Sequence, residues 1–322
     1  MPAVDTAKGI AILFVVFGHA WRGLYEAGVL ANAALFEAVD RIIYAWHIPM
    51  FFFLSGLHFL SVVARDGAAG FLWQRILRLL WPMALWTWVF FAARLLAGDA
   101  ANAPVTWADF PLVPLPPYEH LWFLWALFLV QIGCFAVLIL LPARVRERRK
   151  RLGFAALAGV LVGVMPFIAW PSPYFGAALE HVPYFAAGIA FGALASYRPQ
   201  RWMVGLAGCG FLIDVWALSQ GWREVFQSLD LVLFLWVLIA ALDPGSGSPS
   251  RAIVTLRALG RASMTIYMAH TMFSALLRIA LLYLGVTSAW VHLAFGLTFG
   301  ILGPLILLWA AQKTRTRKLL GL

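Results

Sequence analysis

Apolar residues occupy ten long stretches of the chain, separated by short polar or proline-containing breaks. Stretches such as 42–63 and 121–141 contain no Asp, Glu, Lys or Arg. A bilayer span needs roughly 20 mostly apolar residues, so the pattern predicts an all-α polytopic membrane protein of about ten transmembrane helices. The sixth stretch is short and begins beside Glu180, which leaves a re-entrant segment open. The predicted spans are 7–25, 42–63, 75–96, 120–141, 152–170, 181–196, 202–220, 225–242, 261–284 and 286–312.

Composition supports the membrane prediction, since 63% of the 322 residues are hydrophobic and only 12% are charged. This balance excludes an ordinary water-soluble enzyme. The net charge of +10 would suit a nucleic-acid partner only if the basic residues shared a soluble face, and no polar segment is long enough to provide one. With a cytoplasmic N-terminus, 19 of the 24 Lys and Arg residues fall on the cytoplasmic side. The positive-inside rule therefore predicts that both termini are cytoplasmic and that most basic runs face the anionic lipid bilayer.

Cysteine usage and the N-terminus exclude further classes of protein. Cys134 and Cys209 both lie in apolar stretches without a CxxC spacing, so neither a disulfide framework nor a thiolate metal site is expected. We expect no metal and no permanently bound cofactor. No secretory cleavage site precedes the first apolar stretch, so this stretch is expected to stay in the membrane.

Ionisable residues inside a span are costly and usually mark a functional path. In the first span, Asp5, Lys8, His19 and Arg22 recur at helical spacing and share one stripe. Lys8 and His19 are 11 residues apart, which separates them by roughly 16 Å along the helix axis. An imidazole is the side chain best suited to accept and return a proton near neutral pH. We therefore predict that His19 is catalytic, although a packing histidine is the alternative.

Further polar residues fall at both ends of later spans. Arg75 and Arg78 open the third predicted span and share a face, as expected either for phosphate binding or for lipid anchors. His47 is predicted near the outer interface at a depth similar to that of His19. The fourth span opens on the outer side with Glu119, His120 and Trp122, a wall for a sugar ring or an interfacial aromatic cluster. His270 is predicted to lie in the middle of the ninth span.

Five segments of the chain form a pattern that can be compared with known families. They are Asp5-Thr6-Ala7-Lys8-Gly9-Ile10-Ala11-Ile12, Gly18-His19, His47-Ile48-Pro49-Met50-Phe51-Phe52-Phe53-Leu54-Ser55-Gly56, Leu121-Trp122-Phe123-Leu124-Trp125-Ala126-Leu127, and 263–270. Together these segments resemble the acyltransferase family 3 membrane proteins, and most closely their short, fucose-acetylase-like branch. The resemblance follows the chain in unchanged order, and Lys8 and His19 match the family's Arg/Lys-x10-His element.

The resemblance implies one integral-membrane acyltransferase domain over 1–322, in a bacterial inner membrane, without the extracytoplasmic hydrolase-like domain of some members. It implies transfer of an acyl group, usually acetyl, from cytoplasmic acyl-CoA to a hydroxyl of an envelope glycan or lipid-linked sugar. We expect Lys8, Arg75 and Arg78 to bind acyl-CoA and His19 to act as general base or acyl carrier. The residues expected on the acceptor side are Asp5, Arg22, His47, Glu119, His120, Trp122 and His270.

Two other classes of protein stay open at this stage. A proton-coupled transporter or flippase would use the intramembrane histidines as a relay, but no internal repeat supports it. A non-catalytic scaffold would leave the Lys8 and His19 stripe unexplained. The sequence gives no oligomeric state, and a homo-oligomer is compatible with it.

Overall fold

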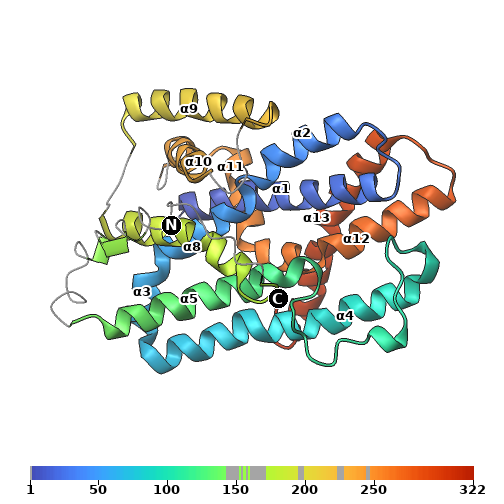
Figure 1. The fold of residues 1–322 in the computed structure, drawn as a ribbon, viewed down its shortest axis with the longest axis horizontal. Helices are drawn as coiled ribbons and strands as arrows, with labels where there is room; N and C mark the ends of the chain where they lie inside the picture. Colours follow the sequence, from blue (N-terminus) through green and yellow to red (C-terminus); the bar gives the residue numbers. More distant parts are fainter. Residues whose placement is uncertain are drawn as a thin grey trace.

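The computed structural model describes residues 2–142, 172–194, 199–222, 228–243 and 247–322, together with 152–153, 155–156 and 159. Within these residues all regular structure is helical, and α1, α4, α5 and α9 lie roughly along the long axis of the molecule (Figure 1). The helices are α1 (Pro2–Glu26), α2 (Ala33–Tyr44), α3 (His47–Arg75), α4 (Trp81–Ala97), α5 (Trp122–Leu140), α8 (Gly176–Leu194), α9 (Arg201–Ser219), α10 (Leu229–Leu242), α11 (Arg251–Arg261), α12 (Ser263–Tyr283) and α13 (Ala289–Lys313).

The all-α prediction is confirmed for the described part of the chain. Six helical segments there are long and apolar enough to cross a membrane by length and composition. The predicted span 152–170 falls largely outside the described residues, as does the basic run 144–151. Ten spans and cytoplasmic termini therefore stay predictions. The six segments are Pro2–Glu26, Ala33–Ala100, Glu119–Leu140, Arg201–Ser219, Ser263–Tyr283 and Ala289–Lys313.

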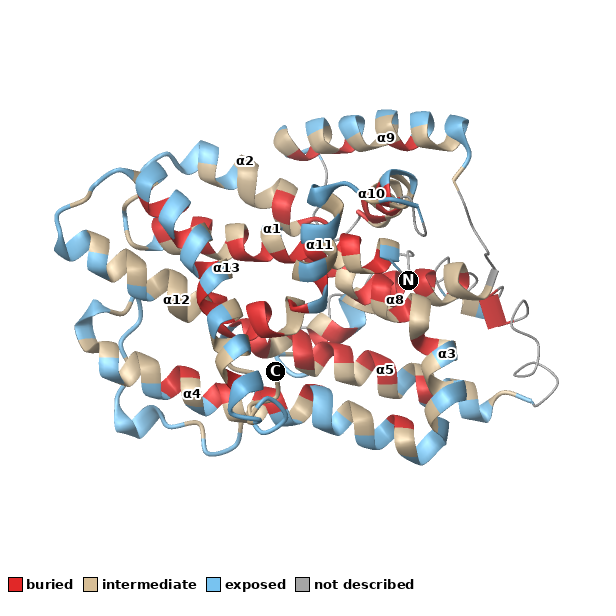
Figure 2. Ribbon diagram, turned by 180° about the vertical axis from the view of Figure 1, so that it is seen from behind, coloured by how far each residue is buried: buried red, intermediate tan, exposed pale blue. Residues whose placement is uncertain are grey.

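Helix α1 lies at the centre of the bundle, in contact with α2, α3, α10, α11, α12 and α13. Buried residues concentrate on α1, α3, α5, α8 and α12, whereas α9 is largely exposed (Figure 2). Small residues on α1 explain its position, since they let neighbouring backbones approach closely. A side chain at Gly9 would meet the backbone of Leu256 in α11, and one at Gly260 would meet the carbonyl of Asp5.

A buried polar cluster also fixes the first turns of α1. The Thr6 hydroxyl donates to a carboxylate oxygen of Asp243 at 2.5 Å. Arg257 of α11 forms an ion pair with the same carboxylate, with its Nε 3.1 Å from Oδ2. Asp243 is buried, and a buried carboxylate is stable only when its oxygens are satisfied by such partners. The cluster therefore joins α1, the end of α10 and α11.

Glycines also bring α3 and α8 together. A Cβ atom built on Gly56 would clash with the carbonyl oxygen of Phe185, and one on Gly188 with that of Phe53. Gly192 approaches the carbonyl of Leu57 in the same way. These contacts confirm the close approach of helices that small residues in a span indicate.

The boundary between the second and third predicted spans, 42–63 and 75–96, differs from the prediction. The break expected at Arg65-Asp66-Gly67 is a kink inside α3, where Gly67 adopts a φ of 67°. Because only a glycine adopts this conformation without strain, the chain bends there and then continues as helix to Arg75. Ile76–Leu80 forms a π-helical turn that leads into α4, so Arg78 lies in this turn.

Candidate active site

Three histidines from distant parts of the sequence meet inside the bundle. His19 comes from α1, His120 from the short 3-10 turn Glu119–Leu121 before α5, and His270 from α12. The ring centroids are 5.4 Å apart for His19 and His120, 5.0 Å for His19 and His270, and 5.2 Å for His120 and His270. His120 and His270 are buried, whereas His19 is partly exposed to a cavity. We call these three residues the histidine cluster.

Backbone contacts determine which ring nitrogens of His120 and His270 carry the proton. His270 Nδ1 lies 2.8 Å from the carbonyl oxygen of Tyr267 and 3.0 Å from that of Ile266. A carbonyl only accepts, so Nδ1 is the donor and Nε2 of the neutral ring carries the free lone pair. His270 Nε2 is buried without a hydrogen-bond partner. His120 Nε2 donates to the Tyr267 carbonyl at 3.2 Å, which leaves its Nδ1 as the acceptor.

His47 lies apart from this cluster. Its Nδ1 donates to the carbonyl of Ile43 at 2.5 Å, and its ring is separated from His19 by the ring of Tyr44. Tyr44 in turn stacks under the Arg22 guanidinium, whose Cζ is 3.3 Å from the ring centroid. His47 lines neither of the two cavities described below.

A polar cavity of about 840 Å³ opens on one side of the histidine cluster. Its three arginines are already engaged by the protein. Arg22 forms a bidentate pair with Asp40 at 2.6 and 2.7 Å, and Arg94 pairs with Glu119. Arg278 donates to the Gly23 carbonyl and to Asn102. The lining therefore carries both signs of charge, with three arginines and two glutamates, and Asp40 pairs with Arg22. The polar, charged and aromatic residues that line it include His19, Arg22, Glu26, Arg94, Asn102, Glu119, His120, Trp122, Arg278 and His292.

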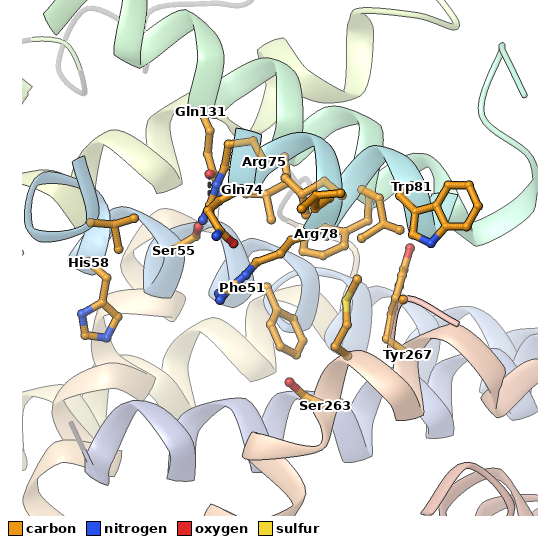
Figure 3. Close-up of a pocket in the computed structure, with 18 of the residues that line it drawn as sticks. Phe51, Ser55, His58, Gln74, Arg75, Arg78, Trp81, Gln131, Ser263 and Tyr267 are labelled. Atoms are coloured by element: carbon orange, nitrogen blue, oxygen red, sulfur yellow. Dashed lines mark hydrogen bonds between the residues drawn. The ribbon is translucent and has the colours of Figure 1, made fainter. Parts of the chain in front are cut away.

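A larger cavity of about 1550 Å³ lies on the other side and has a different character. Lys8, Arg75 and Arg78, which the sequence predicted to bind one ligand, all line it. Figure 3 shows Arg75 and Arg78 beside each other in this lining. No Asp or Glu is among the described residues of its lining. We call it the basic cavity, because such a concentration of like charge favours an anionic ligand. Its other basic and polar lining residues include Ser55, His58, Arg65, Gln74, Gln131, Ser263, Arg317 and Lys318.

A buried amide orients one of these arginines. Arg75 Nη1 donates to Gln131 Oε1 at 2.9 Å, and Gln131 Nε2 donates to the Ser55 hydroxyl at 2.9 Å (Figure 3). Gln131 is 3% exposed, and its amide accepts from Arg75 while it donates to Ser55. Arg75 Nε is buried without a hydrogen-bond partner. The guanidinium that Gln131 holds therefore belongs to a residue that lines the basic cavity.

Tyr267 separates the two cavities. Its side chain lines the basic cavity, whereas the His120 ring that it contacts lines the polar cavity. The Tyr267 hydroxyl donates to the His120 carbonyl, and the His120 ring donates to the Tyr267 carbonyl. Phe123, which also lines the basic cavity, packs against Tyr267. The link between the basic cavity and the histidine cluster therefore runs through Tyr267 and its contact with His120.

The structure gathers most of the predicted site residues into these two cavities. His19, Arg22, Glu119, His120 and Trp122 line the polar cavity, and His270 lies behind it in ring contact with His19. Asp5 lines neither cavity and lies one turn before Lys8 on α1.

Sequence reasoning missed several residues of the basic cavity, chiefly His58, Gln131, Arg317 and Lys318. For Gln131 the signal was present, since it is the one amide in the otherwise apolar helix α5. In the described residues no group of His, Cys, Asp or Glu is arranged to hold a metal ion.

The apolar helices with a polar site inside the bundle define an integral membrane protein. Residues 1–309 match the protein family described as "Acyltransferase domain", and the chain belongs to this family. A curated relative is nodulation protein NolL of Mesorhizobium japonicum, 28% identical over 126 residues. The match covers 39% of this chain and 32% of that protein, so the chain spans about a third of its relative's length. No solved structure matches the chain.

Proposed function

We propose that this protein is a membrane O-acyltransferase that moves an acetyl or other acyl group from cytoplasmic acyl-CoA to a hydroxyl of an envelope glycan or lipid-linked sugar. One observation carries the proposal: His19 and His120 line the polar cavity, and His120 contacts Tyr267, which lines the basic cavity. The basic cavity suits the phosphates of CoA, which Lys8, Arg75 and Arg78 would bind. The polar cavity suits a neutral polyhydroxyl acceptor, with Trp122 as a ring-stacking surface. Family membership supports acyl transfer, and the relevant membrane would be the bacterial inner membrane.

The reaction would proceed by direct transfer. His19 takes the proton of the acceptor hydroxyl while the hydroxyl oxygen attacks the thioester carbonyl carbon. The tetrahedral intermediate collapses with cleavage of the carbon–sulfur bond, and the CoA thiolate takes the proton from the His19 imidazolium. The products are the O-acyl ester and free CoA, and the enzyme returns to its starting state. The competing route, in which His19 first carries the acyl group, uses the same residue.

His270 would orient His19. With its Nδ1 engaged by backbone carbonyls, His270 presents the Nε2 lone pair toward the cluster. A ring centroid separation of 5.0 Å suits one N–H···N hydrogen bond between two imidazoles. His270 would then accept the N–H of His19 and leave the other His19 nitrogen free as base, which is the positioning role that a third group plays beside many catalytic bases.

The proposal is tested by two measurements on purified protein and on cells. Acetyl-CoA should stabilise the detergent-purified protein against heat, by about 2.7 kcal/mol at 100 times the dissociation constant. Mass spectrometry of envelope glycans from cells with and without the protein should differ by about 42 Da per modified hydroxyl, the mass of an acetyl ester. Stabilisation without any change in glycan mass would contradict glycan acylation. Absence of both effects would favour a transporter or scaffold instead.

Gln131 offers a prediction about the donor site. Substitution Gln131→Leu removes the acceptor that holds Arg75, so we expect the KM for acyl-CoA to rise about fivefold with little change in kcat. Ser55→Ala removes only the far end of the same network and should have a smaller effect. Initial rates over a range of acyl-CoA concentrations measure both. Equal KM values for Gln131→Leu and the wild-type protein would exclude a role of this network in donor binding.

A further inference from the structure

The segment that follows α13, residues 314–322, extends past the part of the chain that the family match covers. Arg315 adopts a φ of 59°, and the Thr316 N–H bonds back to the Ala311 carbonyl at 3.0 Å. This left-handed residue ends α13 and turns the chain back toward the bundle. Leu319, Gly321 and Leu322 then line the basic cavity together with Arg317 and Lys318. We call residues 314–322 the C-terminal segment.

Two tryptophans of α4 hold this segment in place. Trp81 Nε1 donates to the Leu319 carbonyl at 2.9 Å, and Trp86 Nε1 donates to the Leu320 carbonyl at 3.0 Å. Gly321, with a φ of 68°, packs closely on Pro82 between them. These contacts join positions more than 230 residues apart in the sequence. The backbone carbonyls of the segment therefore dock it on the wall of the basic cavity, and Leu322 also packs against the hydrophobic core.

Arg317 and Lys318 add two cations to a cavity that already holds Lys8, Arg75 and Arg78. Neither of the two pairs with an Asp or Glu within the described structure, and Arg317 Nε donates to the backbone oxygen of Leu322, the last residue of the chain, at 2.9 Å. Both side chains are exposed, so they lie where the cavity meets solvent. Like charges held together repel one another, and an anion with several phosphate groups would relieve this repulsion.

We propose that Arg317 and Lys318 of the C-terminal segment bind a phosphate of the donor at the mouth of the basic cavity, a contribution that lies outside the family-shared region. The inference rests on the proposed function. The thioester must reach the part of the basic cavity where Tyr267 contacts the histidine cluster, so the opposite end of the donor lies at the mouth. In acyl-CoA that end is the adenosine unit with its 3′-phosphate. The same two cations could instead bind the phosphate of an anionic lipid headgroup, and the experiment separates these two sources.

The test compares acetyl-CoA with 3′-dephospho-acetyl-CoA in nanodiscs of phosphatidylcholine, which carry no net lipid charge. For the Arg317→Ala/Lys318→Ala variant we expect the KM for acetyl-CoA to rise roughly tenfold or more, because two charge-assisted contacts are lost. The KM for the dephospho donor and both kcat values should be unchanged. Arg315→Gly is the matched control, because it removes a charge from the same segment and the Arg315 side chain does not line the cavity. Glycine also adopts the positive φ of this position freely.

A second variant tests the docking contacts and leaves both cations present. Trp81→Phe/Trp86→Phe keeps the aromatic bulk but removes the two N–H donors, so it should raise the KM for acetyl-CoA in the same direction. An unchanged KM in the Arg317/Lys318 variant would overturn the inference, as would an equal rise for both donors. A rise that appears only in nanodiscs with phosphatidylglycerol would assign the pair to lipid and also overturn it. Wild-type protein that transfers no acetyl group would instead contradict the proposed function.

Discussion

Replacement of His19 by alanine is expected to lower acetyl transfer by about 10²- to 10⁴-fold, the usual contribution of a positioned general base. His19 lines the polar cavity, where the acceptor hydroxyl would bind, and it contacts both other rings of the histidine cluster. The loss should appear in kcat, because Lys8, the cation of α1 that would bind the donor, lies about 16 Å away along that helix. Initial rates of CoA release by purified protein measure it. Turnover equal to that of the wild-type protein would exclude His19 as the base.

Two controls separate chemistry from folding in this experiment. Acetyl-CoA should still stabilise the His19→Ala protein against heat, since the basic cavity is intact. His181→Ala removes a partly buried histidine, whose Nδ1 bonds to the Ala177 carbonyl and which lines neither cavity. This variant should keep its activity per folded molecule.

Radiolabelled acetyl-CoA without acceptor also distinguishes the two mechanisms, because label on the wild-type protein that is absent from His19→Ala would indicate an acetyl-histidine.

The second large effect is expected on stability, from Gly188→Ala in α8. The added Cβ would clash with the Phe53 carbonyl, a backbone atom that cannot move without separating α3 from α8. Such overpacking costs about 1 to 3 kcal/mol. Gly208→Ala in α9 is the matched control, because a Cβ there meets nothing within 4 Å. It should be neutral or stabilising by up to about 1 kcal/mol, since alanine favours helix. Unfolding in mixed detergent micelles measures both changes, and equal stability of the two variants would contradict the packing argument.

The apolar spans could be predicted because hydropathy follows directly from residue type. The predicted spans 202–220, 261–284 and 286–312 correspond closely to α9, α12 and α13. Two helices were missed, α2 and α11, because both are short and amphipathic and lie between apolar stretches. The kink at Gly67 was missed for a different reason: a single glycine is compatible with either a loop or a bent helix.

The relative placement of the candidate site residues could be predicted only where one helix determines it. Helical periodicity alone aligned Lys8 and His19 on α1, and the structure assigns them to the two different cavities. The meeting of His120 and His270 with His19 depends on how three helices pack, which no local pattern encodes. The same holds for Arg317 and Lys318, which reach the basic cavity only because the chain turns back after α13.

The close backbone packing of α1 has a consequence for donor selection. Gly9 and Gly260 fix α1 against α11, and the buried Asp243 fixes its first turns, so the cations and the histidine cluster are held at a constant separation. The protein would therefore select donors by the distance between their phosphates and their reacting thioester. A long thioester such as acyl-CoA spans both ends at once. A short analogue, acetyl N-acetylcysteamine for example, can engage only one end and should be a poor substrate even though its reacting group is identical.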